Sequence, residues 1–198
     1  MKEEWIRTEM LLGHDALEHL SRAHVAVFGI GGVGGYVVEA LARSGIGELT
    51  LVDSDRVNLS NINRQIIATH ETVGQNKVDA AAQRVKQIHP DCIIHTYPLR
   101  YEDTNRSLFF TRQYDYIADC IDLVKCKLDL ICTALERGIP ILSAMGTGNK
   151  VDPFQLQITD LSKTEGCPLA RVMRKELRAR GILHTQVLFS PEIPVKPA

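Results

Sequence analysis

The feature that most constrains this chain is a glycine-rich turn between a predicted strand and a predicted helix. The apolar, β-prone run 24–28 leads directly into the sequence GIGGVGG, and residues 36–43 follow with a helical pattern. Glycine suits such a turn because only a backbone without side chains can turn tightly and approach phosphate oxygens closely. The unpaired N–H groups at the start of the next helix add a positive dipole end. A tight turn without a ligand is the alternative. We predict a nucleotide-phosphate site with contacts from Gly29, Gly31, Gly32 and Gly34.

A second strand is predicted at 48–52, and Asp53 closes it. Strand, glycine turn, helix and strand form a βαβ unit, which implies a right-handed parallel pairing. Asp53 stands at about the distance of 20 residues from the glycines that is expected for a ribose-binding carboxylate. A turn-forming aspartate is the alternative, but next to the glycines we favour the ribose contact.

Strand and helix patterns alternate along the rest of the chain. After a broken helix at 7–21 and the βαβ unit, they predict helices at 78–87, 125–137 and 169–180 and strands at 92–97, 116–119, 139–142, 154–158 and 184–189. We predict an α/β fold: a Rossmann-type doubly wound, mostly parallel sheet with helices on both faces and a C-terminal strand–helix addition. The whole chain, 1–198, is expected to form a single domain, with an arm at 1–22, a nucleotide-binding core at 23–148 and an extension at 149–198. The Pro-rich run 191–198 cannot form a regular element.

The segment between Asp53 and Lys77 distinguishes ATP from NAD. It is dense in polar and ionic groups, among them Arg64. A dinucleotide oxidoreductase has no need of an arginine and a lysine here, whereas the charge of a triphosphate and of a leaving pyrophosphate must be countered. Arg64 can grip phosphates through its planar fork, and Lys77 can act as a point charge. Solvated surface cations are the alternative for each.

These motifs resemble those of the ubiquitin-activating-enzyme superfamily, whose bacterial members adenylate small sulfur-carrier proteins. The resemblance rests on G-x-G-G-x-G, Asp53-x-Asp55, Ser60-Asn61-x-x-Arg64-Gln65 and Val73-Gly-Gln-x-Lys77. It implies ATP and magnesium as cofactors, with Asp122 close to the adenylate and its metal ion. It also implies a homodimer in which Arg7 reaches the partner's phosphates. The implied catalytic set is Arg7, Arg64, Lys77 and Asp122, and the implied nucleotide contacts beyond the glycines are Asp53, Asp55, Asn61, Arg64, Gln65, Lys77 and Asp122.

The C-terminal part is similar to one branch, the tRNA threonylcarbamoyladenosine dehydratases. The similarity lies in 7–13, in Asp152-Pro-x-x-Leu-Gln-Ile-Thr-Asp160 and in the charged segment 160–181. It implies cyclisation of a modified adenosine beside the anticodon, with a threonyl carboxylate activated by ATP. Whether the intermediate is an adenylate or a phosphate ester stays open. Members of this branch usually continue further, so the extension is expected to be shortened. The resemblance also implies a sulfur-transfer or redox partner, and the cysteine that handles sulfur in the wider superfamily would lie in the missing part.

The predicted helix 169–180 carries a basic stripe. Its cations follow the spacing i, i+3, i+4, i+7, which places them on one helix face. Leu169, Val172, Met173 and Leu177 should face inward. This pattern alone supports two interpretations equally: an ordinary solvated helix face, and a surface that binds the phosphate backbone of a nucleic acid. The candidate tRNA contacts are Arg171, Arg174, Lys175 and Arg178.

Composition excludes several other classes. The formal net charge is -1, so an anionic partner must meet a local patch. The five cysteines include no Cys-x-x-Cys pair, and the seven histidines show no ligand spacing along the chain, so we expect no zinc knuckle and only surface or structural histidines. Cys167 is the thiol to test for reactivity, while Cys120 is expected to pack at a strand end. With no signal core and no membrane-length run, the chain is predicted to be cytoplasmic.

Two rival functions remain. The first is adenylation of a ubiquitin-like or sulfur-carrier C-terminus, although the paired cysteines that usually hold zinc in those activators are absent. The second is a NAD-binding oxidoreductase or redox sensor, which only the glycine turn and Asp53 support.

Overall fold

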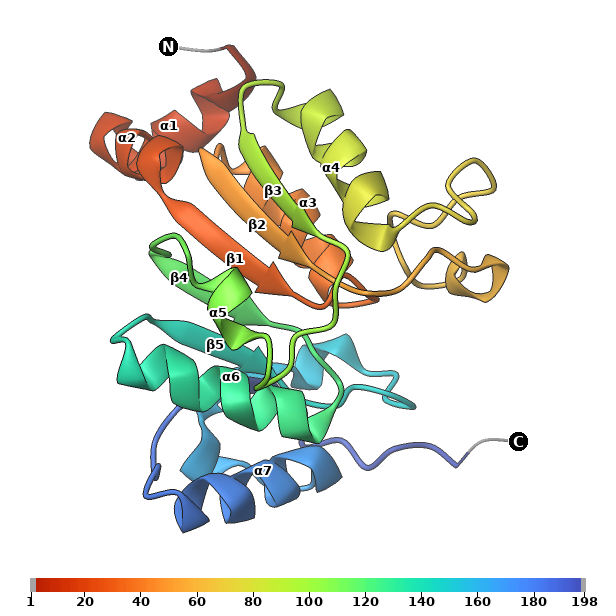
Figure 1. The fold of residues 1–198 in the computed structure, drawn as a ribbon, viewed down its shortest axis with the longest axis vertical. Coiled ribbons are helices and arrows are strands. Elements are labelled where there is room, and N and C mark those ends of the chain that lie inside the picture. The colour runs from red at the N-terminus through yellow and green to blue at the C-terminus, as the bar shows by residue number, and fades with distance from the viewer. Residues whose placement is uncertain (1–2, 197–198) are drawn as a thin grey trace. The chain divides into compact units, whose positions relative to one another are not determined.

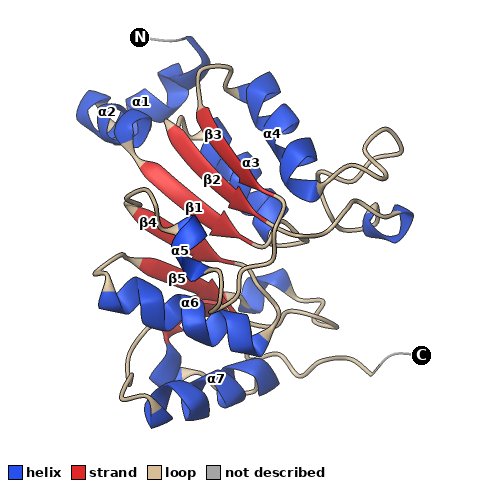
Figure 2. Cartoon of the chain, viewed as in Figure 1, coloured by secondary structure: helices blue, strands red, loops and turns tan. Residues whose placement is uncertain are grey.

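A computed structural model of the protein describes residues 3–196. Its helices are α1 (Ile6–Leu12), α2 (His14–Arg22), α3 (Gly34–Arg43), α4 (Lys77–Ile88), α5 (Arg106–Phe109), α6 (Val124–Glu136) and α7 (Pro168–Ala179). Its strands are β1 (His24–Phe28), β2 (Glu48–Val52), β3 (Ile93–Tyr97), β4 (Tyr116–Asp119), β5 (Ile141–Ala144), β6 (Gln157–Asp160) and β7 (Gln186–Phe189). Short 3-10 turns, η1 to η4, cover Glu3–Trp5, Leu59–Asn61, Pro153–Gln155 and Leu161–Lys163. Figures 1 and 2 show this alternation of strands and helices.

The seven strands form one sheet in the order β3-β2-β1-β4-β5-β7-β6. The first five positions follow the doubly wound order 3-2-1-4-5, because the chain crosses from β3 to the other side of β1. β1 pairs with β2, β2 with β3 and β5 with β7 in parallel, and β6 pairs with β7 in the antiparallel sense. The predicted fold class, a mostly parallel Rossmann-type sheet with a C-terminal addition, is therefore confirmed.

The chain divides into two compact units, one ending at Ile117 and one beginning at Ala118, and each is described by itself. In the first unit, β1 is buried along its whole length, and α3 and α4 pack together and against the strands on one face. On the other face, Phe28 meets Tyr101 and Phe109 at ring-centroid distances of 5.2 and 6.1 Å. This two-sided burial explains why the residues of β1 read as a continuous apolar run after His24.

In the second unit, α6 packs against β5 and α7 packs against α6. The buried face of α7 carries Ala170, Met173 and Leu177, spaced i, i+3, i+7. Val172, which the helical pattern had placed inward, is 44% exposed, so that expectation is wrong. The helix is rotated about its axis so that the half-buried Arg174, and not Val172, lies beside Met173 on the inward side.

Two predicted strands differ in the structure, while a predicted helix break is present. The expected strand 154–158 is a 3-10 turn followed by β6, because Pro153 opens a turn and the Asp152 carboxylate accepts a hydrogen bond from the Phe154 N–H. The strand expected at 139–142 begins only at Ile141 and follows Pro140, which has no N–H to give the sheet. The break at Gly13 is confirmed, with φ at 86°.

The described part of the tail, 191–196, contains no helix or strand, as predicted, and 197–198 lie outside the described residues. Between residues 3 and 196, no helix combines the length and the apolar character that crossing a bilayer requires.

Candidate functional site

The glycine turn joins β1 to α3 in the first unit. Gly29 has φ at 88°, a conformation that glycine adopts without strain, and its N–H donates to the Val52 carbonyl at 2.8 Å. α3 begins at Gly34, so its first N–H groups have no partner within the helix. The turn therefore presents a bare backbone and a helix N-terminus at the carboxyl end of β1. That arrangement suits a phosphate group.

Residues 64 and 65 lie against this turn. A side-chain Cβ built on Gly31 would come within 3.9 Å of Gln65 Nε2, and one on Gly32 within 3.8 Å of Arg64 Cγ. The Arg64 guanidinium is exposed and donates to Ser60 O and Asn63 Oδ1, at 3.0 and 2.9 Å. The structure thus brings the predicted Arg64–Gln65 pair to the predicted glycines.

Gln65 is buried, yet its Oε1 atom has no hydrogen-bond partner among the described residues. A buried carbonyl oxygen without a donor costs about 1–3 kcal/mol. Such an orphaned acceptor beside a phosphate-type turn fits a ligand that supplies a hydroxyl or amino hydrogen.

Asp53 connects the glycine turn with the loop that follows β2. Its Oδ2 accepts a hydrogen bond from the Ile30 N–H at 2.6 Å, and its Oδ1 accepts one from the Asp55 N–H at 2.8 Å. The side chain therefore ties the glycine turn to its own loop, a role that the sequence did not reveal. Burial raises the pKa of the Asp53 carboxyl, against the lowering effect of both N–H donors and of Lys77. A ribose contact would use the lone pairs that these two bonds leave.

Lys77, the first residue of α4, places a buried ammonium beside this loop. Its Nζ lies 2.7 Å from Asp55 Oδ2 and 3.9 Å from Asp53 Oδ2, and its side chain is 7% exposed. Its backbone N–H donates to the Asp55 carbonyl at 3.0 Å. A buried cation at a helix N-terminus is unfavourable by itself, so the two carboxylates hold it there. The predicted group Asp53, Asp55 and Lys77 is thus brought together.

Asn61 has a structural task in the same segment. It is buried, and its Oδ1 accepts a hydrogen bond from the Asn58 N–H at 3.0 Å as part of a reciprocal cap of η2. Its side-chain oxygen is therefore engaged, which leaves its amide N–H groups for the predicted nucleotide contact.

The second unit contains a polar cluster that the sequence analysis missed. Lys127 Nζ donates to Asp119 Oδ2 at 2.7 Å and to Ser143 Oγ at 3.1 Å, and Ser143 Oγ donates to Asp119 Oδ2 at 2.6 Å. The Lys127 and Asp119 side chains are both 0% exposed. The other Asp119 oxygen accepts a hydrogen bond from the Ile121 N–H at 3.1 Å. The cluster fixes the loop between β4 and α6, where the exposed Asp122 lies.

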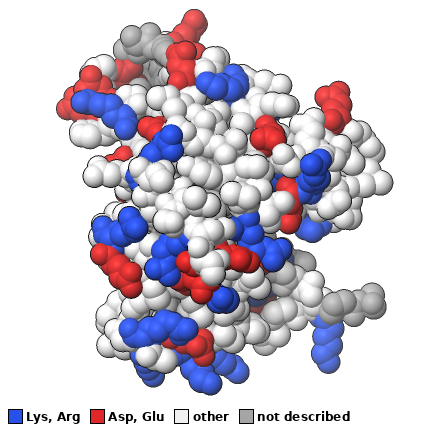
Figure 3. Space-filling view, in the orientation of Figure 1, with Lys and Arg blue, Asp and Glu red and all other residues white. Residues whose placement is uncertain are grey.

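The basic stripe of α7 is present with one change. The segment carrying Arg171, Lys175 and Arg178 is exposed, and Figure 3 shows Lys and Arg atoms gathered over α7. Arg174 instead points into the unit, where its Nη1 donates to the carbonyl and the hydroxyl of Thr164, each at 2.6 Å. These hydrogen bonds from Arg174 hold the loop before α7 in place.

α1 carries Arg7 and an exposed apolar surface. Arg7 is exposed, and Met10 and Leu11 beside it are 83% and 82% exposed. Ile6 and Leu12 are exposed as well. Within the described residues, Arg7 thus lies on a helix whose apolar side chains face solvent.

Two of the cysteines have thiols that burial makes less acidic. Burial raises the pKa of Cys120 to about 12 and that of Cys92 to about 11, which disfavours the thiolate. Cys167, the thiol chosen for a reactivity test, is buried at the start of α7.

Only surface or structural histidines were expected, and His24 and His95 lie in a cluster that the sequence did not predict. His24 at the start of β1, Glu48 at the start of β2 and His95 within β3 place their ligand atoms within 4.8 Å of one another. Spacing along the chain gave no sign of it, because the cluster depends on how three strands are paired. Burial lowers the pKa of His24, against the raising effect of Glu48.

The fold and this site define the chain as a Rossmann-type α/β protein with a phosphate-binding glycine turn and a lysine–carboxylate group beside it. The chain belongs to the ThiF family, whose profile matches residues 6–188.

Two similar proteins are tRNA threonylcarbamoyladenosine dehydratases. That of Bacillus subtilis (strain 168) is 43% identical over 196 residues, which cover 98% of this chain and 77% of the relative. That of Escherichia coli (strain K12) is 39% identical over 198 residues, which cover 96% of this chain and 74% of the relative. A crystal structure of the E. coli enzyme in complex with ATP has a TM-score of 0.93 at 38% identity, and the match covers 99% of this chain and 86% of that one.

Proposed function

We propose that this chain catalyses the ATP-dependent dehydration of threonylcarbamoyladenosine in tRNA, through activation of the threonyl carboxylate. The observation that carries the proposal is the buried Lys77 ammonium, held by Asp53 and Asp55 beside the glycine turn. A cation in that place suits the charge that develops when pyrophosphate leaves. The relatives that share the whole chain at about 40% identity carry the name of this activity.

The chemistry proceeds in two steps. An oxygen of the threonyl carboxylate attacks the α-phosphorus of ATP, pyrophosphate leaves, and a mixed anhydride forms. A nitrogen or oxygen of the neighbouring carbamoyl group then attacks the acyl carbon. AMP leaves with the former carboxylate oxygen, and the carbamoyl N–H proton is released to solvent. The product has lost the elements of water. A carboxylate is already a nucleophile at neutral pH, so no strong general base is required.

The residues take the following roles in this proposal. Gly29, Gly31, Gly32 and Gly34 receive the phosphates, Asp53 the ribose, and Arg64 and Lys77 the phosphate chain, while Asp55, Asn61 and Gln65 complete the nucleotide contacts. Arg64 is exposed and can turn from Ser60 toward a bound phosphate with no loss of buried packing. The three parts of the expected domain, an arm, a core and an extension, would together form one ATP-binding domain.

Magnesium would be held by Asp122. The donor chemistry fits, because Mg²⁺ is bound through one or two carboxylates together with phosphate oxygens and water. Asp122 is exposed, whereas the neighbouring Asp119 is occupied by Lys127 and Ser143. The metal would neutralise charge on the phosphates.

A homodimer would bring Arg7 to the phosphates of the partner. The exposed apolar residues of α1, Met10 and Leu11 above all, support an interface there, since such residues are rarely left in a contiguous patch. tRNA would meet the exposed cations of α7, namely Arg171, Lys175 and Arg178. A tRNA-modifying activity would suit the cytoplasm. A sulfur or redox partner would have to act on a thiol other than Cys92 and Cys120, since burial raises the pKa of both.

Incubation with ATP, Mg²⁺ and tRNA that carries threonylcarbamoyladenosine, followed by nucleoside mass analysis, tests the proposal. We expect the modified nucleoside to lose the mass of one water. Lys77→Ala should abolish this loss, and the matched control Lys163→Ala, at an exposed site, should not. No mass change with the wild-type chain would refute the proposal, and thermal stabilisation by NAD but not by ATP would favour the oxidoreductase instead.

A further inference from the structure

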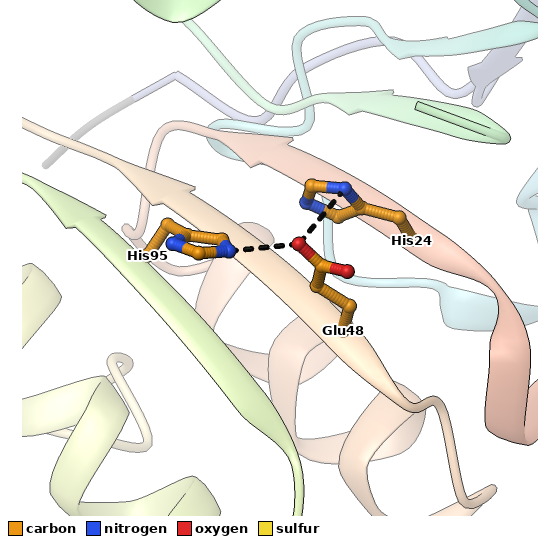
Figure 4. A group of neighbouring side chains, drawn as sticks. All are labelled: His24, Glu48 and His95. Atoms are coloured by element: carbon orange, nitrogen blue, oxygen red, sulfur yellow. Dashed lines mark hydrogen bonds and ion pairs between the residues drawn. The ribbon is translucent and has the colours of Figure 1, made fainter. Parts of the chain in front are cut away.

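A cluster of two histidines and one glutamate lies across three neighbouring strands of the first unit. His24 pairs in register with Glu48, Glu48 with Ile93, and Thr50 with His95. Side chains two apart on a strand share a face, so His24, Glu48, Thr50 and His95 all project from the same face of the sheet. Figure 4 shows both imidazole rings turned toward one oxygen of Glu48.

The ligand atoms are already directed inward. His95 Nε2 lies 2.7 Å and His24 Nδ1 3.3 Å from Glu48 Oε1. The other ring nitrogen of His24, Nε2, is 2.8 Å from Thr50 Oγ1 in the buried interior. A metal-bound histidine characteristically uses its second nitrogen in this way, since a hydrogen bond from that N–H fixes the tautomer and the ring orientation.

The spacing is close to what a small tetrahedral ion requires. Ligand atoms about 2.0–2.1 Å from a zinc ion in tetrahedral geometry lie about 3.3–3.4 Å from one another. The His24–Glu48 distance of 3.3 Å already has this value, whereas the His95–Glu48 distance of 2.7 Å needs to open by about 0.6 Å. The two histidine nitrogens lie within 4.8 Å of each other. His24 is buried, while the Glu48 and His95 side chains are 29% and 22% exposed, so an ion and a fourth ligand from solvent have access.

We infer that His24 Nδ1, Glu48 Oε1 and His95 Nε2 form a binding site for a divalent transition-metal ion of the zinc type. Two imidazoles and one carboxylate are ligands that zinc prefers, whereas Mg²⁺ and Ca²⁺ take oxygen ligands. The site lies toward the amino ends of β1 and β2, and the glycine turn and Asp53 follow their carboxyl ends. It is therefore separate from the nucleotide site, and it does not depend on the proposed function.

The surroundings set the strength of binding. Glu48 contributes one negative charge, so the filled site carries one positive charge. Asp115, whose Oδ2 accepts a hydrogen bond from the His24 backbone N–H at 2.7 Å, partly balances that charge. The positive charge of Arg112 also acts on His24, where it lowers the pKa and opposes a cation. The ion would join β1, β2 and β3 in addition to their hydrogen bonds.

In the absence of metal, the same atoms form a hydrogen-bonded network. Both imidazoles then face Glu48, His24 Nε2 faces the Thr50 hydroxyl, and the His24 ring also has a hydrogen bond to the Gln113 backbone. Metal binding at His24 Nδ1 requires the ring proton to lie on Nε2, from which it donates to Thr50, and it opens the His95–Glu48 distance. Metal titration distinguishes the two states.

Isothermal titration of the purified full chain with Zn²⁺, and absorption spectroscopy with Co²⁺, test the inference. We expect one Zn²⁺ per chain and the visible absorption of four-coordinate Co²⁺. Replacing an outer-shell partner typically weakens binding by about 10–100-fold. His95→Gln and Glu48→Gln should therefore weaken Zn²⁺ binding by more than about 100-fold, and Thr50→Val by about 10-fold.

His184→Gln is the matched control, because His184 is an exposed histidine that pairs with Asp160. It should bind Zn²⁺ as the wild-type chain does. Circular dichroism checks that each variant is folded, and Thr50→Val keeps the test decisive if a ligand variant does not fold. Absence of Zn²⁺ binding in the wild-type chain, or equal binding in the wild-type chain and all three site variants, would overturn the inference.

Discussion

Replacing Lys127 by methionine should be among the most destabilising single substitutions in the second unit. The change preserves most of the side-chain length but removes the ammonium that lies 2.7 Å from Asp119 Oδ2 at a site with 0% exposure. Asp119 then keeps only the Ser143 hydroxyl and the Ile121 N–H as donors. Removing one partner of a buried ion pair costs about 3–5 kcal/mol, because the remaining charge stays buried without its counterion.

Urea unfolding followed by circular dichroism measures this loss. With an m-value of about 2 kcal/mol/M, a loss of 3–5 kcal/mol lowers the urea midpoint by about 2 M. Ser143→Ala removes two hydrogen bonds to charged groups but leaves the ion pair itself, and should cost about 1.5–3 kcal/mol. Lys163→Met, at an exposed position, should change the free energy of unfolding by less than about 0.5 kcal/mol.

A double variant tests the physical reason for the effect. Asp119→Leu together with Lys127→Met leaves no buried charge, so it should be much more stable than the sum of the two single losses predicts. Equal midpoints for Lys127→Met and Lys163→Met would refute the reasoning. Strict additivity in the double variant would contradict it as well, since it would mean that the two groups do not interact.

Other parts of the chain give three further predictions. Arg84 donates twice to Glu39, and these bonds lower the pKa of the Glu39 carboxyl against the raising effect of burial. That stabilisation is present above about pH 4.3 and is lost as pH falls through the lowered pKa. As pH is lowered, the free energy of unfolding of the wild-type chain should therefore fall by about 1 kcal/mol more than that of the Glu39→Gln variant. Equal losses of unfolding free energy in the two proteins over this pH range would contradict the prediction. Gly47→Ala should cost about 3 kcal/mol in urea unfolding, since a Cβ there would overlap the Ser21 carbonyl oxygen, and a stable variant would exclude that contact. Arg174→Ala should lower the free energy of unfolding by about 1.5–3 kcal/mol, because it removes the hydrogen bonds to Thr164. Arg171→Ala should leave the free energy of unfolding unchanged and reduce the salt slope of tRNA binding, measured by filter binding, by about 1. A stable Arg174→Ala variant beside a destabilised Arg171→Ala variant would contradict the assignment of Arg174 to the Thr164 loop.

Local pattern was enough to predict much of the fold. The run of buried residues in β1, the glycines after it and the helix at α3 each leave a signal within a few residues. The same holds for the loop after β2, where Asp53 and Lys77 were predicted to serve one site and do lie together. Sequence pattern identifies such groups when they flank a single βαβ unit, because the topology of that unit has only one common hand.

Contacts between distant segments were not predictable in the same way. The His24, Glu48 and His95 cluster requires the register of three strands, and a slip of one residue would turn a side chain to the other face. The Asp119, Lys127 and Ser143 cluster likewise depends on how α6 is rotated against β4 and β5. By spacing along the chain, Arg174 cannot be told from the exposed cations of α7. Its inward direction depends on the position of the carbonyl groups in the preceding loop.

In the proposed reaction, ATP activates the threonyl carboxylate by transfer of its AMP part. Oxygen-18 in the carboxylate of threonylcarbamoyladenosine tRNA tests it directly, with mass analysis of the released nucleotides. Attack on the α-phosphorus makes a carboxylate oxygen the bridging atom, so we predict one oxygen-18 atom in AMP and none in pyrophosphate. Label in inorganic phosphate, with ADP as the other product, would contradict adenylation and indicate a phosphate ester.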